Sequence, residues 1–531
     1  PPRSTLFPST TLFRSLTGEF HPWRYTDDMY AIESISLLAG AQPHWFHPRL
    51  RFFSGREHKL PVDQHMLMAM VAPRGLMIFA GYAESAANPF ALEQAYRSAM
   101  TVYRFHQRED NLWLHLREGE HSTETGDIEI FMDFFDTVFG RKKFPKSETW
   151  VAGYEFEAWK RATGVKVDAL QHPRMAPGDF LSGISTAAQW DGRKAGVRGR
   201  IAAALGPDAP GLAMPPRHRI SEFTPPARTI LEQLLARPTG EPHWRERLRA
   251  AGMGLAAMPF GEGLSADLYY PLDDSGQRKP GKFPVVVWLH PYTYGGGWSA
   301  RRPWEPRSAD YILDQRPSFV SLVKRGFAVL AFDQIGFGSR IHHARRFYGR
   351  YPEWSLMGKM VADTRAAVAS LKELEDIDSS RIYLLGYALG AKVGLFTAAF
   401  DESVRGVAAV CGVDALRLSG GDDGIEGLRH YSHLHGLIPR LGFFLGQEPR
   451  VPFDYDEVLA LAAPRPVLVV APTLDRYAPV DDVRQVVEAS RKVYRLLGSE
   501  RALTLETPLD FNRFTRGTQE RVFDWLLRQA R

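Results

Sequence analysis

The sequence is poor in cysteine, in long apolar runs and in charge of one sign. A single cysteine, Cys411, excludes an internal disulfide framework, although it does not exclude secretion. No apolar run is long enough for a transmembrane helix, so no membrane partner is predicted. The 66 basic and 61 acidic residues give a net charge of +5 without a long basic block, which argues against a nucleic-acid partner. At 531 residues and 44% hydrophobic content, the chain suffices for several globular domains.

The first fifteen residues, PPRSTLFPSTTLFRS, lack the apolar core of a signal peptide. The string resembles translated sequencing-adapter read-through, and a natural disordered tail is the alternative. We expect residues 1–15 to be non-native. Localisation stays open, with the periplasm and the cell exterior as candidates, and no feature indicates an oligomeric state.

An internal match organises the rest of the chain. The segment LPVDQHMLMAMVAPRGLMIFAGYAES, from Leu60, aligns without a gap with VPFDYDEVLALAAPRPVLVVAPTLDR, from Val451, at an offset of 391 residues. The same offset pairs His44 with His435. A register this constant predicts a tandem duplication.

The second copy extends upstream of the match to about Leu255, and the first copy would need residues ahead of Pro1 to do the same. We therefore expect residues 16–145 to be the C-terminal half of a first, truncated unit. Residues 226–531 are expected to form a second, nearly complete unit. Residues 146–225, rich in Pro, Gly, Arg and Ala, are expected to be a linker with helices, one of them near Gly196–Leu205.

Short apolar runs alternate with helical patterns in the second unit. The runs predict buried parallel strands at Phe283–Leu289, Phe327–Phe332, Arg381–Leu385, Val404–Val410, Pro466–Val470 and Leu503–Glu506. Helical periodicity covers Met360–Leu374 and Asp482–Leu497. This alternation predicts an α/β fold with a doubly wound, mostly parallel sheet.

One motif follows the strand that ends at Leu385. Gly386-Tyr387-Ala388-Leu389-Gly390 has the spacing of the G-x-S-x-G nucleophile elbow, between a strand and a helix. Its central residue is Ala388, so the hydroxyl is absent. The motif therefore favours the fold and argues against nucleophilic catalysis.

Two further positions complete the arrangement of a catalytic triad. Asp475 follows the Pro466–Val470 strand, where an acid would orient a histidine, and a loop or capping role is the alternative. The segment after the last strand has no histidine but has Asn512, which cannot shuttle a proton near neutral pH. Ala388, Asp475 and Asn512 are thus degenerate triad positions.

A glycine-rich loop follows the Phe283–Leu289 strand. Tyr292, Gly295 and Gly296 lie in HPYTYGGG, which is similar to the HGGG-type oxyanion loop of esterases, and a simple glycine turn is an equal alternative. No G-x-x-x-x-G-K-[ST] motif is present, and neither cofactor nor metal is predicted.

The first unit keeps what the second has lost. The offset of 391 pairs Asp475 with Glu84 and Asn512 with His121, which gives an acid and a base in register. The nucleophile position would fall before residue 1. Glu84 and His121 are the predicted catalytic residues, with a plain surface role as the alternative for each.

Residues about 18–139 resemble the C-terminal half of the bacterial glucuronoyl esterases, which are carbohydrate esterases of the α/β-hydrolase fold. The resemblance is carried by Trp45, LPVDQH from Leu60, Ala72-Pro73-Arg74, Ala87-Asn88-Pro89 and the His121 loop. It implies that Glu84 is the triad acid and His121 the base. From about Leu255 onward, the chain is similar to acetyl xylan esterase and dienelactone-hydrolase-like proteins, but departs from them at Ala388 and Asn512.

These observations predict tandem α/β-hydrolase units from a parent that hydrolyses carboxylic esters of carbohydrates, with acetyl or glucuronoyl esters as substrates. The second unit would be a pseudoenzyme. The alternative is a non-catalytic carbohydrate-binding or scaffold protein, and a G-x-S-x-G motif upstream in the gene would decide between them.

Overall fold

The computed structural model describes residues 21–25, 32–41, 43–82, 88–119, 122–207, 218–223, 244–299, 317–419 and 427–531. They fall into two compact units. The first takes in the described residues up to Gly153 together with 292–299 and 336–346, and the second takes in the others. No helix in these ranges is long and apolar enough to cross a membrane.

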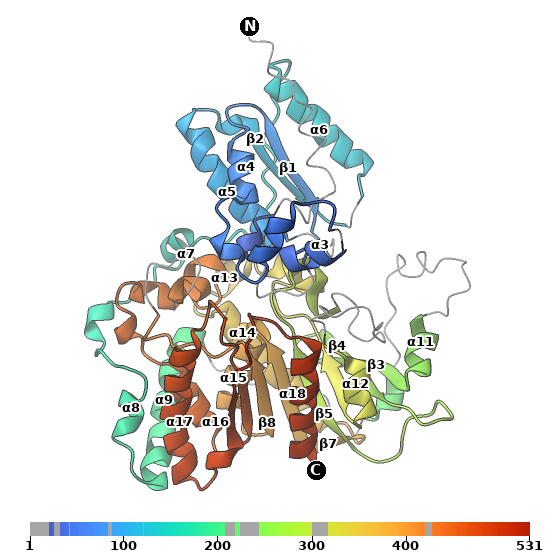
Figure 1. The fold of residues 1–531 in the computed structure, drawn as a ribbon, viewed down its shortest axis with the longest axis vertical. Coiled ribbons are helices and arrows are strands. Elements are labelled where there is room, and N and C mark those ends of the chain that lie inside the picture. The colour runs from blue at the N-terminus through green and yellow to red at the C-terminus, as the bar shows by residue number, and fades with distance from the viewer. Residues whose placement is uncertain are drawn as a thin grey trace. The chain divides into compact units, whose positions relative to one another are not determined.

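The second unit is built on a sheet in which the structure describes eight strands (Figure 1). They are β3 (Met253–Phe260), β4 (Leu264–Pro271), β5 (Phe283–Leu289), β6 (Ala328–Ala331), β7 (Ile377–Tyr387), β8 (Gly406–Val410), β9 (Val467–Val470) and β10 (Leu503–Glu506). Across the sheet the order is β10-β9-β8-β7-β5-β6-β4-β3. The strand β4 runs antiparallel to both of its neighbours, β3 and β6, and the other described pairs in this sheet are parallel. The predicted α/β class with a mostly parallel sheet is confirmed.

The strands predicted from apolar runs are the central ones. Val285–Leu289 of β5 is fully buried, as expected for a strand covered on both faces. The outer strands β3 and β4 were not predicted, because Gly, Pro, Ser and Asp interrupt their apolar residues. Buried and less buried residues alternate along most of β4, which is typical of an antiparallel strand near a sheet edge.

Helices cover much of the second unit. They are α7 (Phe156–Thr163), α8 (Asp179–Ser182), α9 (Ala187–Leu205), α11 (Trp244–Ala250), α12 (Phe319–Lys324), α13 (Phe347–Arg350), α14 (Leu356–Lys372), α15 (Leu389–Phe400), α16 (Tyr455–Ala462), α17 (Val480–Leu496) and α18 (Arg516–Ala530). The helices α14, α15, α16 and α17 pack side by side in that order. On α12 and α18, Arg325 at the end of the first helix pairs with Glu520 and Asp524 of the second.

The predicted linker is largely part of the second unit. Residues from Tyr154 belong to that unit, and α9 buries Trp190, Val197 and Ile201 completely. Arg200 of this helix also pairs with Glu457 at 2.5 Å. A helix is therefore present where one was expected near Gly196–Leu205, and its Gly, Arg and Ala content conceals one apolar face in the sequence.

The first unit contains a two-stranded parallel sheet of β1 (Leu76–Gly81) and β2 (Leu112–Arg117). Figure 1 shows α4 (Gln64–Ala69) and α5 (Pro89–Phe105) on one side of this sheet and α6 (Thr125–Val138) on the other; α3 (Ile35–Ala41) precedes them. Met77, Trp113 and Phe134 form the core between the sheet and α6.

The internal match in sequence is also a match in structure. The elements β1, β2 and α5 start 391 residues before β9, β10 and α17, and α5 and α17 also end in register. Leu76 pairs with Leu112 as Val467 pairs with Leu503. Cis peptide bonds precede Pro73 and Pro464, again 391 residues apart.

An arginine distinguishes the two matched segments. Arg465 donates to the carbonyls of Ala398, Asp401 and Val404, at the end of α15 and the turn before β8, at 2.6, 2.8 and 3.0 Å. Its counterpart Arg74 donates through Nε to the carbonyl of Val71 at 3.2 Å, as Arg465 does to Ala462 at 3.0 Å. In the second unit, the Arg465 guanidinium thus bonds to carbonyls at and after the end of α15. Among the described residues, Arg74 makes no matching bonds in the first unit.

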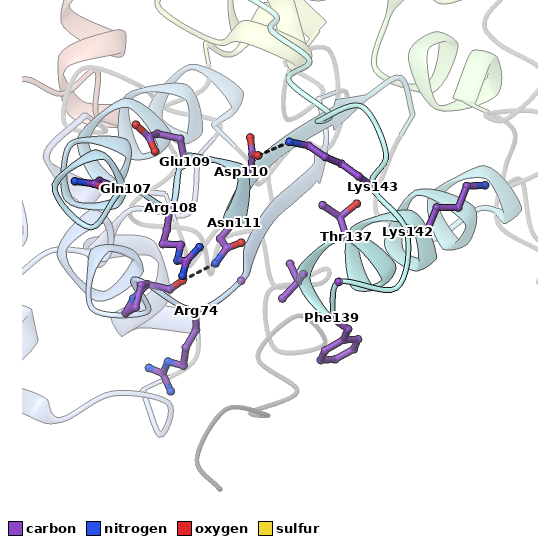
Figure 2. A pocket seen from close by; sticks show the side chains of 14 residues that line it. Arg74, Gln107, Arg108, Glu109, Asp110, Asn111, Thr137, Phe139, Lys142 and Lys143 are labelled. Carbon is purple, nitrogen blue, oxygen red and sulfur yellow. Dashed lines mark hydrogen bonds and ion pairs between the residues drawn. The ribbon is translucent and has the colours of Figure 1, made fainter. Parts of the chain in front are cut away.

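Arg74 instead lines an open hollow of about 1060 Å³ at the amino ends of β1 and β2 (Figure 2). A Lys143–Asp110 ion pair of 3.0 Å and a bond from Asn111 Nδ2 to the carbonyl of Pro73 cross it. Glu84 and His121 follow the opposite, carboxyl ends of these strands, so the hollow is not the predicted catalytic site.

We expect Arg465→Ala to lower the free energy of unfolding of the second unit by about 2–4 kcal/mol, because buried carbonyls lose charged donors. Arg74→Ala is the matched control and should change stability by less than about 0.5 kcal/mol. Urea denaturation with hydrogen exchange read at α15 and β8 measures both. Equal effects of the two substitutions would contradict the assignment of Arg465 as a clamp.

Candidate functional site

The turn between β7 and α15 consists of one residue, Ala388. Its backbone has φ 48° and ψ −111°, a conformation that side-chain-bearing residues rarely adopt. The N–H of Ala388 donates to the carbonyl of Val410 at 2.9 Å, and its own carbonyl accepts from Ala391 at 3.1 Å. The strand, strained turn and helix expected from the motif are therefore present, and the buried Ala388 methyl group lies at the turn.

The two glycines of the motif are required by close approach. A Cβ on Gly390 would lie 1.9 Å from the carbonyl oxygen of Leu289, and one on Gly386 would lie 2.2 Å from the carbonyl of Gly390. The start of α15 thus approaches the backbone at the end of β5 more closely than any side chain at residue 390 would allow. This contact places residue 388 at the carboxyl end of the central strands.

Asp475 and Asn512 meet beyond the ends of β9 and β10. Asn512 Nδ2 donates to Asp475 Oδ2 at 3.0 Å, and the N–H of Tyr477 donates to Asp475 Oδ1, also at 3.0 Å. Both side chains are buried. The hydroxyl of Tyr387, next to Ala388, donates to the backbone carbonyl of Asn512 at 3.0 Å. The predicted acid and histidine positions therefore come together, near the turn at residue 388.

The predicted oxyanion loop contains a hydrogen-bonded turn. Tyr292, Gly295 and Gly296 belong to the first compact unit. The N–H of Gly296 donates to the carbonyl of Thr293 at 2.9 Å, so this amide is used within the turn. Tyr294, at φ 29°, stacks flat on Phe90 with centroids 5.1 Å apart. The oxyanion role of this loop and the glycine-turn alternative both stay predictions.

Glu84 and His121 lie outside the described residues, and the strands that lead to them are adjacent. Gly81 at the end of β1 pairs with Arg117 at the end of β2. Arg117 donates from Nη2 to the carbonyl and hydroxyl of Ser122 at 2.6 and 2.8 Å, and from Nε to Asp127 at 2.8 Å. Arg117 thereby connects the end of β2 with Ser122, the residue that follows His121 in the sequence.

A histidine, His342, contacts Tyr82, the residue that follows β1. The Tyr82 hydroxyl is hydrogen-bonded to Nε2 of His342, within the same compact unit. Burial, with a smaller contribution from Glu118, raises the pKa of Tyr82 to about 12. Tyr82 therefore stays protonated at neutral pH.

Comparisons with known proteins agree with this geometry. A model of the fungal glucuronyl esterase family matches residues 10–106, and a model of the α/β-hydrolase family matches residues 286–526. The chain has the α/β-hydrolase fold, and its N-terminal part is similar to the glucuronyl esterases.

Individual relatives of this α/β-hydrolase match different parts of it. Carbohydrate esterase MZ0003, from an unknown prokaryotic organism, is 29% identical over 119 residues, which are 20% of this chain and 28% of that esterase. YtaP of Bacillus subtilis, named as a hydrolase, is 25% identical over 224 residues, which are 41% of this chain and 69% of YtaP. A glucuronoyl esterase from Solibacter usitatus superposes with a TM-score of 0.47 at 16% identity, over 68% of this chain and 99% of that one.

Sequence reasoning missed a buried polar cluster beside the turn of this α/β-hydrolase. Lys392, one helical turn after Ala388, donates to Asp414 at 2.5 Å and to the Tyr431 hydroxyl at 2.9 Å. Burial and, to a smaller extent, Lys392 lower the pKa of His435 to about 3. The signal in the sequence was a lysine inside the otherwise apolar helix ALGAKVGLFTAAF.

We expect Ala388→Gly to raise the free energy of unfolding by about 1 kcal/mol, because glycine removes the strain of the positive φ. Ala391→Gly, in the regular part of α15, is the matched control and should lower it by about 1 kcal/mol. Chemical denaturation measures both variants. A destabilising Ala388→Gly would show that the turn is unstrained.

Proposed function

We propose that this α/β-hydrolase derives from a carbohydrate-ester hydrolase and that its second unit binds ligands without hydrolysing them. The observation that carries the proposal is the Asp475–Asn512 hydrogen bond beside a strained turn that holds Ala388. These are the positions of acid, base and nucleophile, with only the acid retained. The name of one relative, a carbohydrate esterase, and the match of residues 10–106 to the fungal glucuronyl esterase family support a carbohydrate ester as the parental substrate class.

The chemistry of the three side chains explains the expected inactivity. A serine esterase needs a hydroxyl that attacks the ester carbonyl and a base that accepts its proton. The methyl group of Ala388 cannot attack, and the amide of Asn512 cannot accept a proton near neutral pH. Asp475 orients this amide as it would orient an imidazole, so the geometry of the site persists without its reactivity.

For the first unit, we propose Glu84 as the acid and His121 as the base of a serine esterase mechanism. The adjacency of the ends of β1 and β2 supports this, because it directs the two following segments to one edge of the sheet. In such a mechanism, His121 would take the serine proton and return it to the leaving alcohol, while Glu84 would hold the imidazole in one tautomer.

The rival function is a non-catalytic carbohydrate-binding or scaffold protein throughout. It requires that Glu84 and His121 have no catalytic role. The two hypotheses agree that the second unit, with Ala388 and Asn512, does not hydrolyse esters.

We expect Ala388→Ser alone to leave the second unit inactive on 4-nitrophenyl acetate, because a serine without a base stays protonated. Removing one key triad member costs up to about a million-fold in kcat, so restoring one recovers little. Ala388→Ser with Asn512→His should give weak turnover, measured as release of 4-nitrophenol. Ester hydrolysis at a typical esterase rate by the single variant would refute the proposal.

The control for the double variant is the further substitution Asp475→Asn. It should lower the recovered rate by at least about tenfold, because the new imidazole loses the carboxylate that holds its tautomer. Unchanged turnover would mean that the activity arises elsewhere in the chain.

A further inference from the structure

The orientation of the Asn512 amide is determined by its partner. An ionised carboxylate only accepts hydrogen bonds, so Asp475 must face the Nδ2 amino group of Asn512 rather than its oxygen. The distance between Nδ2 and Asp475 Oδ2 is 3.0 Å. The amide oxygen Oδ1 therefore points away from Asp475, and it cannot exchange places with Nδ2 without losing this bond.

Asn512 Oδ1 is buried and accepts no hydrogen bond from any residue that the structure describes. Asn512 as a whole is 4% exposed. An unsatisfied buried acceptor costs about 1–3 kcal/mol, and native proteins fill nearly all such positions from the protein or from water. The donor to this oxygen is therefore not among the described residues, and a bound ligand or a water molecule would satisfy it.

The neighbouring groups define the chemistry of that donor. The triad base normally accepts from the nucleophile hydroxyl, but the methyl group of Ala388 offers no donor there. Burial, with a contribution from Asp475, raises the pKa of the Cys411 thiol well above its usual range, so this side chain is uncharged. The carboxylate of Asp475 disfavours an anion. A neutral ligand with a hydroxyl fits these conditions.

We propose that the second unit binds a hydroxyl group of a neutral sugar, with Asn512 Oδ1 as the acceptor. The inference rests on the proposed function and deepens it: the degenerate site would bind the alcohol part of a carbohydrate ester instead of attacking the ester. Asn512 is then a specificity-determining residue, and the donor position left empty by Ala388 is occupied by the ligand.

The test uses methyl β-xyloside and its tri-O-methyl derivative, which has the same ring but carries methyl groups in place of its three hydroxyl donors. Binding of each to the full-length chain is measured by titration with ligand-observed NMR. We expect the free xyloside to bind about 3- to 10-fold more tightly, the contribution of one neutral hydrogen bond. Asn512→Leu should remove this difference by weakening the free xyloside alone.

Two variants serve as controls. Gln334→Leu replaces another fully buried amide, at the end of β6, whose side-chain atoms also find no partner among the described residues. It should leave the ligand difference intact. Ala388→Ser supplies an internal donor to Asn512 Oδ1, so it should raise the melting temperature and weaken the free xyloside about 3- to 10-fold.

Absence of xyloside binding, or a ligand difference that survives Asn512→Leu, would overturn the inference and leave water as the donor. A difference lost in Gln334→Leu but not in Asn512→Leu would also overturn it. If Asn512→Leu fails to fold, the comparison of Ala388→Ser with the native chain still decides. These outcomes are independent of hydrolysis by Ala388→Ser, which tests the proposed function.

Discussion

The close approach of α15 to β5 is the constraint on which the second unit depends. No Cβ fits at Gly390, because the Leu289 carbonyl oxygen occupies its place. This contact forces the chain to pass from strand to helix in one residue and leaves Ala388 at φ 48°. The strained turn is present although its side chain, a methyl group, has no nucleophilic reactivity. Selection on packing, rather than on catalysis, is sufficient to retain such a turn, since both glycines are needed to bring the helix against the sheet.

The sequence predicted well the features that are local. The turn at Ala388 follows from a five-residue motif between a strand and a helix, and the central strands follow from continuous apolar runs. Features that join distant segments were not predictable in this way. Lys392 pairs with Asp414 only because β8 lies beside β7, and a single sequence shows the lysine but not its partner. The glycine-rich loop is a further example, since its sequence pattern does not reveal that the Gly296 amide bonds to the Thr293 carbonyl.

The internal match was the strongest source of information in the sequence about segments that are far apart along the chain. A constant offset of 391 residues relates strands, a long helix and a cis peptide bond, so one segment serves as a structural reference for the other. Comparing the two matched segments also shows where the same residue type has a different role in each. Arg465 clamps the carbonyls after α15, whereas Arg74 at the matching position lines an open hollow. The residue is the same, and its role depends on whether a helix end lies within reach.

Under the proposed function, Asn512 stands where an esterase has a histidine, and this difference affects the chemistry of the site more than its shape. Both side chains can donate to Asp475, and both present an acceptor on the opposite side. A histidine nitrogen is basic enough to take a proton, but an amide oxygen is not, so the acceptor can bind a hydroxyl without activating it. The same buried Asp475 thus supports either outcome, since its part is to orient the group that donates to it. Under the proposed function, the second unit can therefore recognise a ligand without catalysing its hydrolysis. Asp475, the strained turn and an Asn512 acceptor that no described residue fills together give a polarity that suits the alcohol of an ester.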